Sequence, residues 1–373
     1  MKGQAGSGRP QPAQHRLGGL EWLRFFAASA VLVWHYQHFA WAGGIGFEVE
    51  AQPFYALLAP FYLWGERAVE VFWCLSGYIF FQSYHERIAS RQVDFTTFAV
   101  YRFSRLYPLH ILTLIAVALM QGIYHRQFGE YFVNIYQNAY HFMLHLMFAA
   151  QWGLQHGLAF NAPIWSVSLE IPVYALFFVL ARQTAGARTV IAVLACLELS
   201  VLLGWDLLAR CALYFFAGGS VRVLCRDLAT RHALRIAAFM AIVLLAFTVV
   251  REFTAITPPR LVFDLPWTML LVGVAALPLP FFARSEGLAA SLGNLTYAIY
   301  LLHFPMQLAI VLIMTRFDLP IDYRSPLLFT VYFSTVLALA FAVFHMIERP
   351  AQQSIRKLYM NRRRKREAPA IQT

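Results

Sequence analysis

Two side chains that can do chemistry share the first long apolar segment of the chain, residues 20–42. Arg24 and His35 are eleven positions apart; at about 100° per residue they lie on one helix face, about 16 Å apart along its axis. The guanidinium offers a permanent positive charge for an anionic group, and the imidazole can accept or release a proton near neutral pH. A structural alternative is an arginine that extends to the membrane surface and a histidine that hydrogen-bonds a neighbouring helix.

An acidic residue, Glu70, lies near the start of the second apolar segment, residues 67–84. It can reach the depth of His35 if the two segments pack side by side as helices. A carboxylate beside an imidazole fixes the tautomer and raises the basicity of the ring, as a general base acting on a hydroxyl requires. We therefore expect His35 and Glu70 to be the catalytic residues. Ser76 and Gly77 are small, and we expect both to pack closely against another helix.

A pair of arginines, Arg102 and Arg105, precedes the third apolar segment, residues 106–124. Their spacing places them on one helix face, where bidentate contacts can hold a phosphorylated ligand. Arginines that only set the orientation of a helix in the membrane would occupy the same position.

A group of polar and aromatic side chains opens the fifth apolar segment, residues 163–181. Hydroxyls, an indole and a carboxylate at this point suit a polyhydroxylated acceptor, which would bind by stacking and hydrogen bonds. The alternative is an interfacial tryptophan with helix-capping serines. A nucleophilic serine lacks support because there is no GxSxG elbow. The candidate acceptor-binding residues are Trp165, Ser166, Ser168 and Glu170.

The remaining histidines and the cysteines give weaker signals. His303, in the segment 292–314, is a further candidate substrate-binding imidazole, although a histidine that bonds another helix is the commoner case. His141 and His145 have the spacing of helical metal ligands, but Phe142 replaces the glutamate of HExxH, so we expect no metal site. The 4 cysteines show no CxxC spacing, which argues against a thiolate metal site or a disulfide framework.

The composition shows what must position these residues. Of the 373 residues, 60% are hydrophobic and 13% are charged, whereas soluble domains average about 45–50% and about 25%. The surplus apolar surface excludes an ordinary soluble enzyme and predicts an all-α polytopic membrane protein. The net charge of +11 suits bilayer topology better than nucleic-acid binding, because the basic residues separate long apolar runs. The other runs are 136–152, 189–205, 208–221, 236–250, 263–282 and 326–348.

The arginines predict the topology of these eleven runs. Both chain ends are basic, which places both in the cytoplasm and requires an even number of spans. The most polar run, 136–152, is therefore expected to be re-entrant or interfacial, which leaves ten transmembrane helices. We expect a cytoplasmic polar arm at residues 1–18, a transmembrane domain at 19–350 and a basic cytoplasmic tail at 351–373 that touches anionic lipid.

Six motifs in this chain resemble those of the acyltransferase 3 family of integral membrane acyltransferases. They follow the family's order and extend over almost the whole apolar part of the chain, from residue 20 to residue 350. The motifs are Leu20 to Arg24 with His35, Glu70 to Gly77, Arg102 to Arg105, Ile164 to Glu170, Leu292 to His303, and Ile347 to Pro350.

The resemblance implies ten transmembrane helices and transfer of an acyl group, commonly acetyl from acetyl-CoA, to a hydroxyl of an extracytoplasmic or lipid-linked glycan. It also implies that Arg24, His35, Arg102 and Arg105 are required for function. The chain departs from the family pattern at two places. Trp22, Phe25 and Phe26 replace glycines common around the first arginine, and Ile171 replaces a second glutamate found in many relatives.

These observations together predict an acyltransferase of the cytoplasmic (inner) membrane. Arg24, Arg102 and Arg105 would hold the phosphates of acyl-CoA, the donor substrate. His35, oriented by Glu70, would either deprotonate the acceptor hydroxyl or carry the acyl group, and no permanently bound cofactor is expected. Further partners would be a glycan or lipid-linked saccharide acceptor and membrane lipids, with no nucleic acid. The competing hypothesis is a transporter or flippase of a glycan or lipid-linked precursor, although no inverted repeat with paired broken helices is visible. A catalytically silent scaffold is disfavoured by the number of intramembrane charges.

Overall fold

A computed structural model of the chain describes residues 18–44, 46–182, 194–195, 198, 207–253 and 260–367, and within these ranges the regular structure is helical. The expected span at 189–205 lies almost wholly outside the described residues, as does most of the expected arm at 1–18. The helices are α1 (Gly18–His35), α2 (His38–Gly43), α3 (Tyr55–Trp64), α4 (Ala68–Phe80), α5 (Glu86–Ala89), α6 (Phe95–Phe128), α7 (Ala139–Leu146), α8 (Ile164–Arg182), α10 (Leu207–Cys225), α11 (Thr230–Phe253), α12 (Arg260–Ala275), α13 (Pro280–Arg284), α14 (Glu286–Arg316), α15 (Pro326–Val343) and α16 (Arg349–Glu367). Short 3₁₀ turns, η1 (Val49–Ala51) and η2 (Gly65–Arg67), and π turns, η3 (Phe81–His85) and η4 (Phe344–Glu348), complete the chain order.

The described residues contain six helices long and apolar enough to cross a membrane. They are α6, α8, α10, the first 21 residues of α11, α14, and one continuous helix, Pro326–Lys365, that joins α15 through η4 to α16. This establishes a helical membrane protein but not the expected count of ten. Helix α12 has 16 residues, below the about 20 that a span requires, whereas α4 has 13 residues and continues directly through η3 into α5.

The most polar of the apolar runs forms only a short helix. Within residues 136–152 the one regular element is α7, with 8 residues. At a rise of about 1.5 Å per residue, such a helix is about 12 Å long and cannot cross a hydrocarbon core of about 30 Å.

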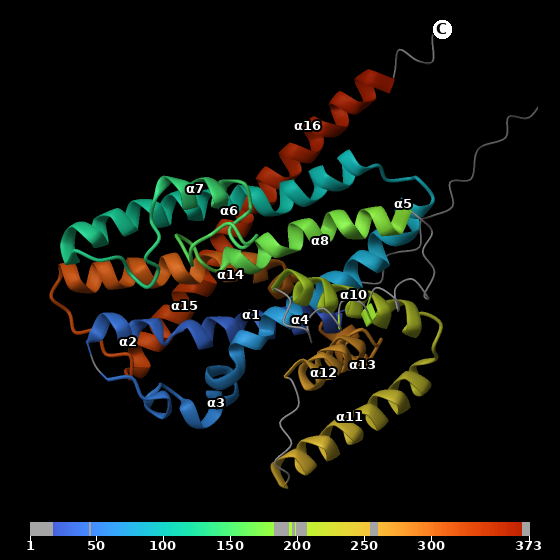
Figure 1. Cartoon of the computed structure of the whole chain (residues 1–373), viewed down its shortest axis with the longest axis horizontal. Coiled ribbons are helices and arrows are strands. Elements are labelled where there is room, and N and C mark those ends of the chain that lie inside the picture. Colours follow the sequence, from blue (N-terminus) through green and yellow to red (C-terminus); the bar gives the residue numbers. More distant parts are fainter. Residues whose placement is uncertain are drawn as a thin grey trace, which may run out of the picture.

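The bundle is organised around α14 and α4. Helix α14 packs against α1, α6 and α15, and α4 packs against α10, which also contacts α8 and α12. Helix α11 lies at the edge of the bundle, whereas α16 extends beyond it (Figure 1). These contacts bring segments from both halves of the chain around a common interior.

Two glycines allow the close approach of α4 and α10. A Cβ atom at Gly77 would collide with the backbone carbonyl of Phe215, and one at Gly218 would collide with that of Cys74. The expected packing role of Gly77 is therefore confirmed. Ser76 behaves differently, because its hydroxyl donates a hydrogen bond to Glu170 of α8 instead of only filling space.

Candidate active site

An arginine-lined cavity of about 310 Å³ lies among α1, α4, α6, α8, α14 and α16. We call it the arginine cavity. Its positive charge comes from three helices that are distant in sequence but adjacent in space. The arginines that line it are Arg24 of α1, Arg102 and Arg105 of α6, and Arg356 of α16.

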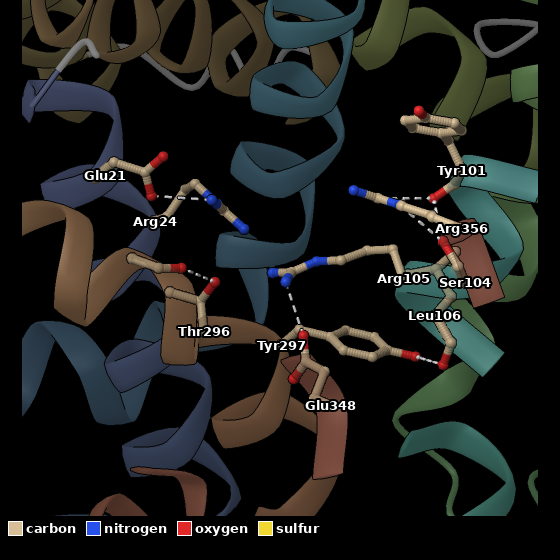
Figure 2. A network of polar contacts seen from close by, with 11 residues as sticks. Glu21, Arg24, Tyr101, Ser104, Arg105, Leu106, Thr296, Tyr297, Glu348 and Arg356 are labelled. Carbon is tan, nitrogen blue, oxygen red and sulfur yellow. Dashed lines mark hydrogen bonds and ion pairs between the residues drawn. The ribbon is translucent and has the colours of Figure 1, made fainter. Parts of the chain in front are cut away.

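Two of these arginines are paired with carboxylates. Nη1 of Arg24 lies 2.9 Å from Oε2 of Glu21, one turn earlier on α1. Nη1 of Arg105 lies 2.8 Å from Oε1 of Glu348, whose side chain is 0% exposed. Figure 2 shows the guanidinium groups of Arg24 and Arg105 extending toward the same space. A buried carboxylate needs such a partner, so Glu348 and Arg105 fix each other.

The other two arginines have no carboxylate partner among the residues that the structure describes. Nη2 of Arg102 donates to the hydroxyl of Tyr84 at 2.7 Å, and its guanidinium carbon lies 4.7 Å from the centroid of the Phe80 ring. Arg356 donates to Ser104 and Tyr101 of α6. Neutral partners orient a guanidinium without cancelling its charge, so both groups remain available to an anion.

One carboxylate lines the arginine cavity in the described part of the chain. Glu170 is buried, and it accepts hydrogen bonds from the hydroxyls of Ser76, at 3.1 Å, and Tyr174. Both hydroxyls bond Oε2 of Glu170, and no arginine of the described residues forms an ion pair with this carboxylate.

A second cavity, of about 710 Å³, lies next to the arginine cavity along the same helices. We call it the histidine cavity. It is lined by His35 and His38 and by aromatic side chains that include Trp34 and Trp165. Residues of α1, α4, α8 and α14 line both cavities, and Tyr300 of α14 is common to the two.

Tyr300 and Ser166 meet at this junction. The hydroxyl of Tyr300 lies 2.7 Å from Oγ of Ser166, and both residues are buried. Because Tyr300 lines both cavities and Ser166 lines only the arginine cavity, their hydrogen bond lies at the boundary between the two spaces.

His35 is held by its own helix. Nδ1 lies 2.9 Å from the carbonyl oxygen of Val31; a carbonyl only accepts, so Nδ1 carries the proton and the lone pair is on Nε2. Gln307 of α14 donates to the backbone carbonyl of His35 at 2.7 Å and bonds Nδ1 of His38 at 3.1 Å. The ring of the fully buried His303 lies 4.6 Å from that of His35, centroid to centroid. His303 lines neither cavity but packs behind His35.

The expected pairing of Glu70 with His35 is not found in the residues that the structure places. Oε1 of Glu70 lies 2.6 Å from Nη2 of Arg210 on α10. A buried carboxylate is stabilised more by a guanidinium than by a neutral imidazole, so Glu70 pairs with α10. The tautomer of His35 is fixed instead by the carbonyl of Val31.

The expected acceptor-binding group on α8 is divided by the helix. Trp165 lines the histidine cavity, whereas Ser166 and Glu170, one turn apart, line the arginine cavity. Ser168 is 0% exposed and donates to the carbonyl of Trp165. The four side chains therefore do not line one cavity, because successive positions on a helix point about 100° apart.

Sequence reasoning missed Arg356, Gln352 and the contact of Glu348 with Arg105. Arg356 and Gln352 line the arginine cavity, yet they fall in the expected tail at 351–373. The ERP motif at residues 348–350 was a signal that this region matters, but the partner of its glutamate is set only by the fold. His141 and His145 have separate contacts, and no group of three or more potential metal ligands gathers in the described chain.

Fold and site together define a polytopic helical membrane protein with an anion-suited cavity and a histidine cavity next to each other in one helix bundle. A family model described as an acyltransferase domain matches residues 17–345. The chain therefore belongs to the acyltransferase 3 family, whose members are membrane acyltransferases. Comparisons with curated proteins and with solved structures found no match.

Proposed function

We propose that the protein transfers an acyl group, acetyl in the first instance, from cytoplasmic acyl-CoA to a hydroxyl of a glycan or lipid-linked saccharide. The observation that carries this proposal is the meeting of the arginine cavity and the histidine cavity at Tyr300. One cavity suits a polyanionic donor, and the other presents an imidazole with a free lone pair. A thioester at the junction would be within reach of both.

The arginine cavity would hold the donor. Arg102 is oriented by Tyr84 and Phe80 and has no carboxylate partner among the residues that the structure describes, so it suits a phosphate group of CoA. Arg105 and Arg24 also present guanidinium groups to the cavity, and each is positioned by its own glutamate. In this proposal the cavity lies at the cytoplasmic side of the inner membrane, and both chain ends are cytoplasmic.

His35 would be the general base. Its Nε2 takes the proton of the acceptor hydroxyl, and the hydroxyl oxygen attacks the thioester carbonyl carbon. A C–O bond forms, the C–S bond breaks, and the CoA sulfur leaves with the proton that the imidazolium returns. Trp165 and the other aromatic side chains of the histidine cavity suit stacking with a sugar ring.

The test is transfer or hydrolysis of radiolabelled acetyl-CoA by purified protein in nanodiscs. His35→Ala should lower turnover by about 10²–10⁴-fold while the protein stays folded. His345→Ala is the matched control, since Nδ1 of His345 makes the same kind of bond, to the carbonyl of Phe341, on an exposed part of the chain.

Retained turnover in folded His35→Ala protein would refute the assignment of the base. If wild-type protein neither binds nor consumes acetyl-CoA and other acyl-CoA donors, the acyltransferase proposal fails and the transporter or flippase hypothesis takes its place.

A further inference from the structure

Helix α16 contributes a wall of the arginine cavity although it lies beyond residues 17–345, the part of the chain that the family model matches. Its side chains bond to α6 from Arg356 to Arg363. Gln352 and Arg356 are its two residues that line the cavity. The site is therefore completed by a segment that the family match does not include.

The guanidinium of Arg356 is held rigidly by α6. Nε donates to Oγ of Ser104 at 3.1 Å, and Nη2 donates to the carbonyl oxygen of Tyr101 at 3.2 Å. The guanidinium carbon also lies 4.5 Å from the centroid of the Tyr101 ring. Arginine has about five N–H donors, so these contacts fix the group and leave donors unused. Figure 2 shows its free end directed toward the space between Arg24 and Arg105.

The position of Arg356 in the cavity identifies the part of a ligand that it meets. Arg356 is half-buried, whereas Ser166 and Tyr300 at the junction are buried. The cavity thus extends from a mouth near α16 to the boundary with the histidine cavity. A donor whose thioester lies at the junction has its nucleotide end at the mouth.

We propose that Arg356 is a donor-binding residue that contacts a phosphate at the nucleotide end of acyl-CoA. This inference rests on the proposed function. It assigns to the C-terminal helix a role in recognising the donor, beyond docking against α6. A docking role alone would affect every donor equally, whereas a phosphate contact affects only donors that carry the phosphate.

The experiment measures KM and kcat with acetyl-CoA, acetyl-dephospho-CoA and acetyl-pantetheine, the last of which has no nucleotide. Arg356→Gln should raise KM for acetyl-CoA by about 10- to 100-fold, the range for loss of one charge-assisted hydrogen bond, with little change in kcat. The ratio of variant to wild-type KM should fall to near one with acetyl-pantetheine. Arg356→Lys keeps a charge at the mouth and should show a smaller loss with the same dependence on donor.

Arg363→Gln is the control for docking. Arg363 lies on the same helix and pairs with Asp94 before α6, so its loss loosens the attachment of α16 without removing an arginine from the cavity. The inference is overturned if the ratio of Arg356→Gln to wild-type KM is the same for all three donors. It is also overturned if Arg363→Gln changes the KM for acetyl-CoA as much as Arg356→Gln does. If wild-type protein uses none of the donors, the proposed function itself has failed; if it uses them and Arg356→Gln matches it, only the role of Arg356 has failed.

Discussion

Arg105→Ala should destabilise the protein by about 3–5 kcal/mol, the usual cost of leaving a buried charge without its partner. The reason is Glu348, which is 0% exposed and loses its guanidinium in this variant. Arg24→Ala removes an arginine from the same cavity, yet it should cost only about 0.2–0.5 kcal/mol. Its partner, Glu21, lies on the same helix, and the two side chains are 22% and 26% exposed.

The assay is thermal unfolding of the purified variants in one detergent, followed by tryptophan fluorescence. The double variant Arg105→Gln with Glu348→Gln removes both charges and should recover most of the lost stability. It should not recover donor binding, because the positive charge in the cavity is still missing. Equal unfolding temperatures for Arg105→Ala and Arg24→Ala would refute the reasoning, as would a double variant no more stable than Arg105→Ala.

Two further predictions concern the junction of the cavities and the start of α6. Tyr300→Phe removes the hydroxyl that bonds Ser166 and should lower the stability of the protein by about 0.5–1.5 kcal/mol. The variant should also hydrolyse labelled acetyl-CoA faster in the absence of acceptor, because water from the histidine cavity then reaches the thioester. An unchanged rate of this hydrolysis would contradict the prediction. Asp94 caps α6 by accepting from the backbone amide three residues later, at 2.7 Å, which lowers the pKa of its carboxyl group. Asp94→Ala should therefore cost about 0.5–2 kcal/mol at neutral pH. Since the pKa of Asp94 is lower in the folded protein, the stabilisation by Asp94 is present above about pH 4 and is lost as the pH falls through the folded-state pKa. The unfolding curves of wild-type and Asp94→Ala protein should therefore converge in acid and stay apart in base.

Local spacing predicted the parts of the site that depend on one helix. Arg102 and Arg105, three positions apart, do line the same cavity. Arg24 and His35, eleven positions apart on α1, line the two neighbouring cavities, one each. These outcomes follow from helix periodicity, which a sequence displays directly.

Choices among tertiary partners could not be predicted in the same way. Glu70 had a plausible partner in His35, but the fold brings Arg210 of α10 next to it, and the charged pair is the more favourable one. Arg356 was indistinguishable in sequence from the other basic residues near the C-terminus, because its contact with Ser104 depends on how α16 meets α6. The expected ten spans are not confirmed, because six helices of the described residues are long and apolar enough to cross a membrane and the expected span at 189–205 lies almost wholly outside those residues.

The helix from Pro326 to Lys365 is one element of 40 residues, about 60 Å long, whereas the hydrocarbon core of a bilayer is about 30 Å thick. About half of it must therefore lie outside the hydrocarbon, and the protruding half carries Arg356. Any change in tilt or depth of the apolar half is transmitted along the same rod to the wall of the arginine cavity. A mismatch between the apolar half of this helix and the bilayer would therefore shift the half that carries Arg356. The shape of the arginine cavity is thus expected to depend on bilayer thickness.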